Sequence, residues 1–218
     1  MFYSFCRTLI VGLARLLFGV QVRGRDRVPR SGTFVLAPSH RSTLDIPLAA
    51  AVTTRRMRFM AKRELWHGKF WSRVFDELGA VPVDRDGGDR AALRVLEAAV
   101  VAGEPIVVFP EGTRSSGTEL APLFSGAAYL ALKRGVPIVP VGIGGSEEII
   151  GRRGGIPWFS RVCVVVGEPI VCERTEGMIK RSAITAANDE LRARLQACFD
   201  DARAWSAARS GGQSGERV

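Results

Sequence analysis

The chain contains 2 histidines, so a histidine that acts as a general base must be His40 or His67. Asp45 follows His40 in an H-x4-D pattern. If His40 lies in a loop and Asp45 in the first turn of the next helix, the carboxylate can hold one ring nitrogen and leave the other free to accept a proton. Only Glu64 offers His67 a comparable partner. Taken alone, the pattern also fits a loop histidine beside an aspartate that favours a helix start.

A second segment whose side chains could take part in binding or catalysis is F-P-E-G-T-R-S at residues 109–115. It follows an apolar run that is typical of a strand, and open α/β sheets bind their ligands at the carboxyl ends of strands. Gly112 permits a close approach of the backbone, and the planar guanidinium of Arg114 suits a phosphate. The alternative is a solvated turn with a surface ion pair between Arg114 and Glu111.

Two further segments have a structural interpretation, and the first of them also has a functional one. Residues 79–85 predict a strand that ends in Asp84 and Arg85, which form either an ion pair or, through Arg85, a second phosphate-binding site. Residues 136–141 read V-P-I-V-P-V, which is typical of a buried strand with proline boundaries.

The elements that must position these groups alternate along residues 23–209. We expect strands at 33–37, 58–61, 80–83, 106–109, 138–143 and 162–166. We expect helices at 44–52, 69–78, 89–102, 125–133 and 181–207. This alternation of apolar strands and helices predicts a single α/β domain with a central, mostly parallel sheet covered by helices. Residues 210–218 are predicted to be a flexible tail.

Residues 1–22 precede this domain and are strongly apolar. The charges of Arg7 and Arg15 leave an uninterrupted stretch of 7 residues, whereas a spanning helix needs about 20. On a helical wheel these arginines lie opposite Phe2, Leu9, Leu13 and Leu16. The pattern predicts an amphipathic helix in a membrane interface, with its arginines at anionic head groups. A helix packed on the protein's own core remains the alternative, and a signal peptide is disfavoured because residues 21–27 lack a small-residue cleavage site.

The charge balance favours anionic partners. Lys and Arg number 31 against 22 acidic residues, a formal net charge of +9, which suits phospholipid head groups, nucleic acid or phosphorylated substrates. Basic runs interleaved with aromatic residues are missing, as are zinc and helix-turn-helix signatures, so nucleic acid is disfavoured. The 4 cysteines are widely spaced without a C-x-x-C pair, which predicts free thiols. Neither a P-loop nor a G-x-G-x-x-G motif occurs.

Taken in order, the four segments resemble the PlsC-like glycerolipid acyltransferases, the 1-acylglycerol-3-phosphate O-acyltransferase family. The resemblance runs from about Gly24 to Pro169 and rests on H-x4-D, G-x-x-x-x-D-R, F-P-E-G-T-R-S and V-P-I-V-P-V at ordinary spacings. Residues 60–65 also look like a family feature. Many members carry Asn before the motif histidine, where this chain has Ser39.

The resemblance implies a role for each motif residue. His40 would be the catalytic base and Asp45 its partner. The acceptor's glycerol phosphate would be surrounded by Arg85, Glu111 and Arg114, with Gly112 and Thr113 shaping the loop and Lys62 adding positive charge. Ser42 lies near the pair, but a nucleophilic role is disfavoured because the chain lacks a G-x-S-x-G elbow and a serine at a helix start is more often a cap.

The activity implied by the resemblance is transfer of a fatty acyl group from acyl-CoA or acyl carrier protein to a lysophospholipid hydroxyl. The expected acceptor is 1-acylglycerol 3-phosphate, which would give phosphatidic acid, with no cofactor and no metal. Another lysolipid or glycerol 3-phosphate is the alternative acceptor. A peripheral membrane protein on the cytoplasmic face, in contact with an anionic surface, is expected. The rival is a non-enzymatic, basic, lipid-binding protein, which would not need His40. Acyl-chain length and oligomeric state stay open.

Overall fold

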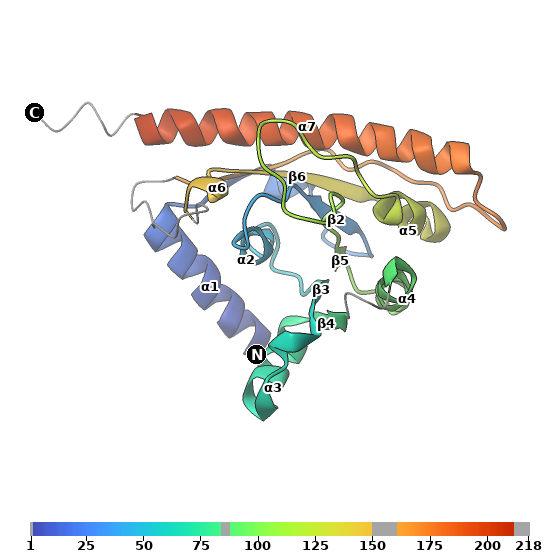
Figure 1. The fold of residues 1–218 in the computed structure, drawn as a ribbon, viewed down its shortest axis with the longest axis horizontal. Coiled ribbons are helices and arrows are strands. Elements are labelled where there is room, and N and C mark those ends of the chain that lie inside the picture. Colours follow the sequence, from blue (N-terminus) through green and yellow to red (C-terminus); the bar gives the residue numbers. More distant parts are fainter. Residues whose placement is uncertain (1, 84–87, 150–160, 212–218) are drawn as a thin grey trace, which may run out of the picture.

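The computed structural model describes residues 2–83, 88–149 and 161–211 (Figure 1). Its strands are β1 (Gln21–Arg23), β2 (Val35–Pro38), β3 (Arg58–Lys62), β4 (Ala80–Val83), β5 (Ile106–Val107), β6 (Ile138–Gly144) and β7 (Cys163–Val166). Its helices are α1 (Phe2–Phe18), α2 (Asp45–Ala49), α3 (Gly68–Leu78), α4 (Gly88–Val101), α5 (Gly126–Arg134), α6 (Ser146–Ile149) and α7 (Arg181–Gly211), with short 3-10 turns η1 (Arg25–Arg27) and η2 (Arg63–Leu65).

The strands form one 7-stranded sheet in the order β1-β7-β6-β2-β5-β3-β4. Only the pair β6–β7 is antiparallel, and the other neighbouring strands run parallel. The predicted α/β fold with a mostly parallel sheet is therefore confirmed. Because β2 lies between β5 and β6, the segments that follow these three strands meet at one edge of the sheet.

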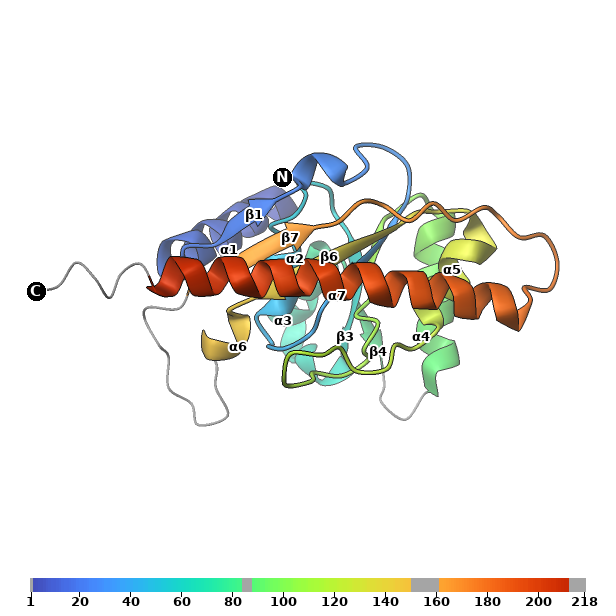
Figure 2. The same cartoon turned by 90° about the horizontal axis from the view of Figure 1, so that it is seen from above.

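Both faces of the sheet are covered, which explains why its strands are apolar on both sides. Along β2, Val35 and Ala37 pack into one core with side chains of α4, α5 and α7. Leu36 packs into the other core, which includes residues of α1 and α2. Helix α7 runs the length of the molecule over β6 and β7 (Figure 2).

Two glycines in β6 set the distance between the sheet and α7. A Cβ atom on Gly142 would lie 2.0 Å from the carbonyl oxygen of Cys198, and one on Gly144 would lie 2.5 Å from the backbone of Ala202. Any larger residue there would push α7 away from the sheet. The absence of two side chains therefore allows the direct backbone contact that anchors this helix.

The structure differs from the sequence expectation at several elements. β1 and α6 were not expected, since 3 and 4 residues show no readable periodicity. β5 ends at Val107 instead of continuing to residue 109, because the chain then turns and the amide of Gly112 donates to the carbonyl of Phe109 at 3.0 Å. α2 covers fewer residues than the predicted 44–52. α7 continues to Gly211, and residues 212–218 of the predicted tail lie outside the described residues.

Helix α1 presents its apolar face outward. Phe2, Phe5, Leu9, Leu13 and Leu16 are between 44% and 79% exposed. The opposite sector packs on the protein through the buried Val11 and through Arg7, whose Nε donates to the carbonyls of Ala50 at 2.9 Å and Thr53 at 2.7 Å. Nε of Arg7 is thus directed at carbonyls just beyond α2, and the contact of Arg7 with head groups stays a prediction.

Candidate functional site

The candidate site lies where the chain leaves β2, β5 and β6. His40 and Asp45 come from the β2–α2 connection, Glu111 and Arg114 from the loop after β5, and Ser146 from the start of α6, after β6. The two motif loops are joined directly, since the amide of Ser115 donates to the carbonyl of His40 at 3.1 Å. The sheet order thus brings together groups that are far apart in the sequence.

His40 and Asp45 form the pair that their spacing predicts. Nδ1 of His40 lies 3.2 Å from Oδ2 of Asp45, with the histidine near the start of the loop after β2 and the aspartate in the first turn of α2. A carboxylate can only accept, so the shared proton belongs on Nδ1 and Nε2 keeps its lone pair. The His40 ring packs against Phe109, with the ring centroids 4.2 Å apart, and its side chain is 14% exposed.

Asp45 is wholly buried and held on both oxygens. Its Oδ2 accepts the backbone amides of Arg41 and Ser42, each at 2.6 Å, in addition to the His40 ring. Its Oδ1 accepts the hydroxyl of Ser146 at 2.6 Å. These donors satisfy both carboxylate oxygens and fix the direction of the carboxylate toward the imidazole.

Ser146 is an addition that sequence reasoning missed. It is fully buried, and it bonds a residue 101 positions away. The neighbouring Glu147 has a raised pKa, first because of burial and then because of the charges of Glu148 and Asp45. A lone serine after a strand carries no local signal of this contact, so only the fold could reveal it.

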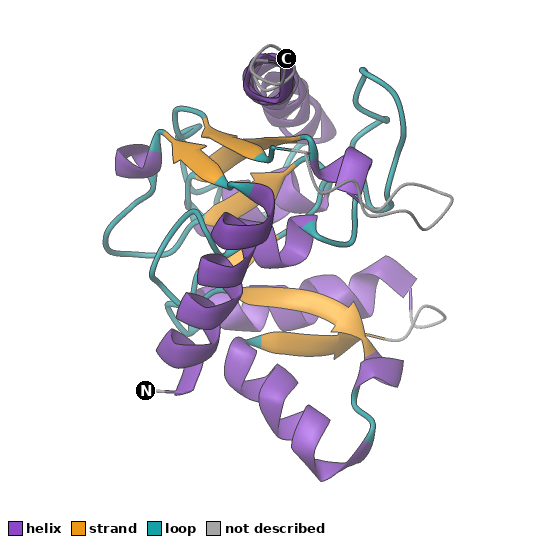
Figure 3. Cartoon of the chain, turned by 90° about the vertical axis from the view of Figure 1, so that its left-hand side faces the viewer, coloured by secondary structure: helices purple, strands orange, loops and turns teal. Residues whose placement is uncertain are grey.

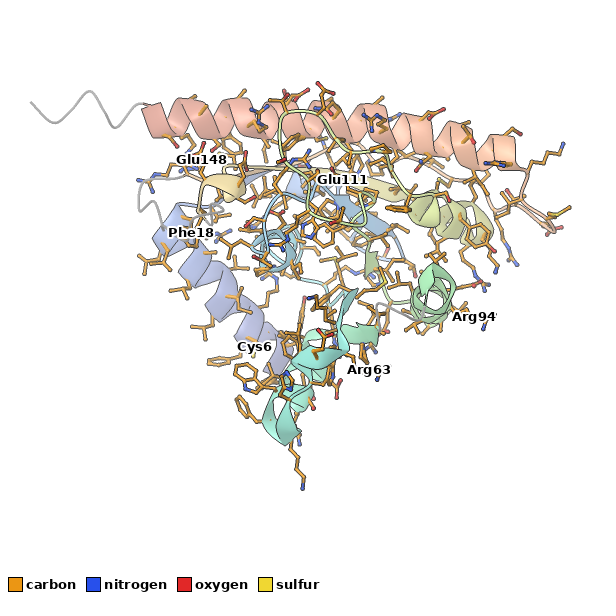
Figure 4. The ribbon with its side chains drawn as sticks, in the orientation of Figure 1. Cys6, Phe18, Arg63, Arg94, Glu111 and Glu148 are labelled. Atoms are coloured by element: carbon orange, nitrogen blue, oxygen red, sulfur yellow. The ribbon has the colours of Figure 1, made fainter. Side chains whose placement is uncertain are left out.

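Glu111 faces the protein interior and not the open side of the site. Its side chain is 0% exposed and lies within the fold beneath α7 (Figure 4). Oε1 accepts the backbone amide of His40 at 3.0 Å, while Oε2 accepts the Arg41 guanidinium at 2.7 Å, the Ala121 amide at 3.0 Å and the Ser115 hydroxyl. Its role in binding acceptor stays a prediction. Its contacts with His40 and Arg41 tie the two motif loops together, and those with Ser115 and Ala121 hold its own loop.

Arg41 is the buried cation that balances Glu111. Its side chain is 2% exposed, donates to the carbonyl of Glu119 at 3.0 Å and lies over the ring of Phe199 in α7, 4.5 Å from the ring centroid. Sequence reasoning overlooked Arg41, because an arginine beside the motif histidine looks like one more surface charge in a chain with 31 basic residues.

The other predicted ligand-binding residues lie on the exposed side of the same edge. Gly112, Thr113 and Arg114 are exposed, and so is Lys62 at the end of β3. Within residues 2–83, 88–149 and 161–211, the guanidinium of Arg114 and the ammonium of Lys62 have no hydrogen bond or ion pair. Arg85 lies outside the described residues.

Gly112 explains the shape of the loop. Its φ of 67° is in the left-handed region, and a Cβ atom would lie 2.6 Å from the ring of Phe124. A side chain at this position would meet both backbone strain and a clash. The close approach predicted for Gly112 is thus made to an aromatic ring of the protein.

The remaining serines near the pair have structural contacts. Ser39 accepts the amide of Ile143 at 3.0 Å and so joins the end of β2 to β6. Ser42 accepts the amide of Leu44 at 3.3 Å, a local turn contact at the start of α2. His67 is exposed and precedes α3, and no carboxylate contacts its ring within the described residues.

The described residues include no cluster of three or more His, Cys, Asp or Glu side chains arranged to hold a metal ion. No described helix is both long and apolar enough to cross a membrane. All 4 cysteines are free, and burial raises the pKa of Cys198 to about 11.

Comparison with known proteins gives consistent matches. A family model described as acyltransferase matches residues 19–144. The chain is 26% identical to the 1-acyl-sn-glycerol-3-phosphate acyltransferase of Bacillus subtilis (strain 168), over 89% of this chain and 95% of that protein. It is 26% identical to the enzyme of the same name from Streptococcus pneumoniae, over 94% of this chain and 76% of that protein. The crystal structure of the 1-acyl-sn-glycerophosphate (LPA) acyltransferase PlsC from Thermotoga maritima superimposes with a TM-score of 0.71, at 25% identity, and the match covers 91% of this chain and 79% of that one.

Proposed function

The chain belongs to the acyltransferase family, and on this premise we propose that it transfers a fatty acyl group from a thioester to the free hydroxyl of 1-acylglycerol 3-phosphate. The observation that carries the proposal is the His40–Asp45 pair at the carboxyl edge of the sheet, with Nε2 left unbonded by the described residues beside exposed cationic side chains. The relatives named for this reaction support the choice of acceptor.

The proposed reaction is a direct transfer with His40 as general base. Nε2 takes the proton of the acceptor hydroxyl while the hydroxyl oxygen attacks the thioester carbonyl carbon. When the tetrahedral intermediate collapses, the C–S bond breaks and the leaving thiolate receives the proton from the His40 imidazolium. Asp45 stabilises the imidazolium between these two steps. The products are phosphatidic acid and a free thiol.

The exposed cations give the acceptor its position. Arg114 offers a bidentate fork for the phosphate, and Lys62 offers a second positive charge from the neighbouring strand end. Holding the phosphate at a fixed distance from Nε2 places the hydroxyl beside the base. The family resemblance adds Arg85 to this set.

The outward apolar face of α1 supports peripheral attachment to a membrane. A surface helix of a soluble protein usually turns its apolar face toward the core, whereas here Leu9, Leu13 and Leu16 are exposed. Both proposed substrates carry long acyl chains and partition into bilayers, so an enzyme lying in the interface meets them there. We place the protein on the cytoplasmic leaflet, where anionic lipids attract a chain of net charge +9.

A donor–acceptor panel tests the proposal. Purified protein is given acyl-CoA or acyl carrier protein as donor, and 1-acylglycerol 3-phosphate, glycerol 3-phosphate or another lysolipid as acceptor, with His40→Ala as the control. We expect phosphatidic acid from the wild-type protein and nearly none from the variant. A rival lipid-binding protein without enzymatic activity would give no product with any pair, while both proteins would bind liposomes equally.

A further inference from the structure

The segment that follows β3 ends in an exposed aromatic tip. After Lys62 the chain forms η2 and then α3, where Leu65, Phe70 and Trp71 are 42%, 71% and 53% exposed. Phe70 and Trp71 meet edge to face with ring centroids 5.4 Å apart. Scattered exposed apolar residues are ordinary, but adjacent large aromatic side chains on one helix mark an interaction surface.

This aromatic tip, defined as Leu65, Phe70 and Trp71, adjoins α1. The two helices pack against each other, and the amino-terminal end of α1 lies beside α3 (Figures 1 and 3). The side of α1 that contacts the protein is held by Tyr3, whose hydroxyl donates to the carbonyl of Arg55 at 3.0 Å, and by Arg7. The apolar stripe of α1 and the tip are therefore fixed relative to one another.

Basic side chains surround the tip. Exposed cationic residues beside it are Lys62, Arg63, Lys69 and Arg73. Three acidic residues share this segment: Glu64 and Asp76 are exposed, with a carboxylate oxygen of Asp76 accepting the indole N–H of Trp66 at 2.9 Å, and Glu77 is half-buried. Apolar aromatic rings within a basic border match a bilayer with anionic lipids, because head groups meet the border and acyl chains meet the rings.

We infer that the aromatic tip is a second bilayer contact, which together with the outer face of α1 docks the protein on an anionic membrane in one orientation. A single helix in an interface leaves the molecule free to roll about the helix axis. A contact on α3, away from that axis, removes this freedom. Since Lys62 directly precedes η2, the same contact holds the proposed phosphate-binding edge near the depth of the head groups. This last step rests on the proposed function.

Vesicle binding by the full-length chain tests the inference. Phe70→Ser/Trp71→Ser is compared with Val171→Ser/Met178→Ser, a control that removes two side chains 84% and 92% exposed elsewhere. Flotation uses phosphatidylcholine vesicles with and without phosphatidylglycerol, and circular dichroism checks folding. We expect the tip variant to bind roughly a hundredfold more weakly, since burial of each of the two large apolar side chains is worth about tenfold. The control should bind like the wild type.

Two further measurements separate the possible outcomes. Lys69→Gln/Arg73→Gln should weaken binding only to vesicles that contain phosphatidylglycerol, and added salt should abolish the difference. Unchanged binding by the tip variant would overturn the inference. So would a wild-type dimer that the tip substitutions convert to a monomer without change in vesicle binding, because the tip would then join two copies of the chain.

The same variants distinguish failure of the inference from failure of the proposed function. With short-chain, water-soluble substrates, the tip variant should turn over at the wild-type rate, and it should lose rate only with substrates embedded in vesicles. If the wild-type protein makes no phosphatidic acid, the proposed function fails, while the flotation result still decides whether the tip contacts lipid. If both assays of the tip variant match the wild type, only the second contact is refuted.

Discussion

The two sides of the candidate site differ in whether their polar side chains already have hydrogen-bond partners within the protein. On the base side, Asp45 and Glu111 are buried and their oxygens accept donors from the protein itself. On the phosphate side, Arg114 and Lys62 are exposed and have no partner among the described residues. Under the proposed mechanism, the contrast means that the base is preorganised before substrate arrives, whereas the cationic side is completed by the ligand.

This contrast makes the two sides respond differently to substitution. Changes on the base side should lower turnover or stability, because they disturb groups that are already in place. Changes on the phosphate side should raise the KM for the acceptor and leave the fold intact. A base-side variant that changes only the acceptor KM, or a phosphate-side variant that lowers turnover or stability, would contradict this comparison.

The largest effect is expected for His40→Ala. General base catalysis contributes about 10²–10⁴-fold, so turnover should fall by that order while the fold persists. The control is His67→Ala, which removes the other histidine and should leave turnover unchanged. Steady-state rates with a saturating donor measure both, and near-normal turnover in His40→Ala would remove His40 from the mechanism.

Glu111→Gln should have the next largest effect, on stability. The change leaves the buried guanidinium of Arg41 without its counter-charge, and breaking a buried pair costs about 3–5 kcal/mol. Chemical denaturation should show a correspondingly lower free energy of unfolding. Turnover should fall as well, because the single acceptor oxygen of glutamine cannot serve both the His40 amide and the donors around Arg41. If Glu111→Gln unfolds like the wild type and only acceptor KM rises, Glu111 belongs on the phosphate side.

Arg114→Ala should act on binding alone. Loss of a charge-assisted contact to phosphate should raise the acceptor KM by roughly ten- to a hundredfold with little change in donor KM. Arg114→Lys should restore only part of this loss, because an ammonium cannot replace a bidentate fork. A rise in donor KM instead would assign Arg114 to the thioester carrier.

Ser146→Ala should give the smallest effect of the four. Without the hydroxyl, Oδ1 of Asp45 loses its donor, and an unmatched buried acceptor should lower kcat by roughly tenfold. Because Ser146 is buried and acts on the pair through Asp45, acceptor KM should stay unchanged, in contrast to Arg114→Ala. A change in KM without a change in kcat would contradict this role.

The sequence predicted those parts of the molecule whose signal is local. Strand β6 is buried at every residue and reads as a continuous apolar run, so its position could be predicted. The His40–Asp45 contact follows from a loop and a helix start only five residues apart. By contrast, the contacts of Arg41 with Glu111 and of Ser146 with Asp45 join residues 70 and 101 positions apart, and no local pattern encodes them.

Helix α1 shows a different limit of prediction. The helical wheel separates an apolar from a polar sector, but it does not tell which sector meets the protein. The polar sector does so here, because Arg7 satisfies carbonyls after α2 and Tyr3 satisfies that of Arg55. Removing residues 1–20 would therefore also strip contacts from the domain, including those of the buried Val20, and substitutions on the outer face are the cleaner test of membrane binding.

The carboxylates of Asp45 and Glu111 should also slow the exchange of nearby backbone amide hydrogens with deuterium from the solvent. Amides in loops usually exchange within the shortest labelling times, because nothing holds their hydrogens. The amides of His40, Arg41, Ser42 and Ala121 lie in loops or turns, yet each donates to one of these two carboxylates. They should exchange as slowly as amides of the central strands, so the two motif loops would open only together with the core of the domain.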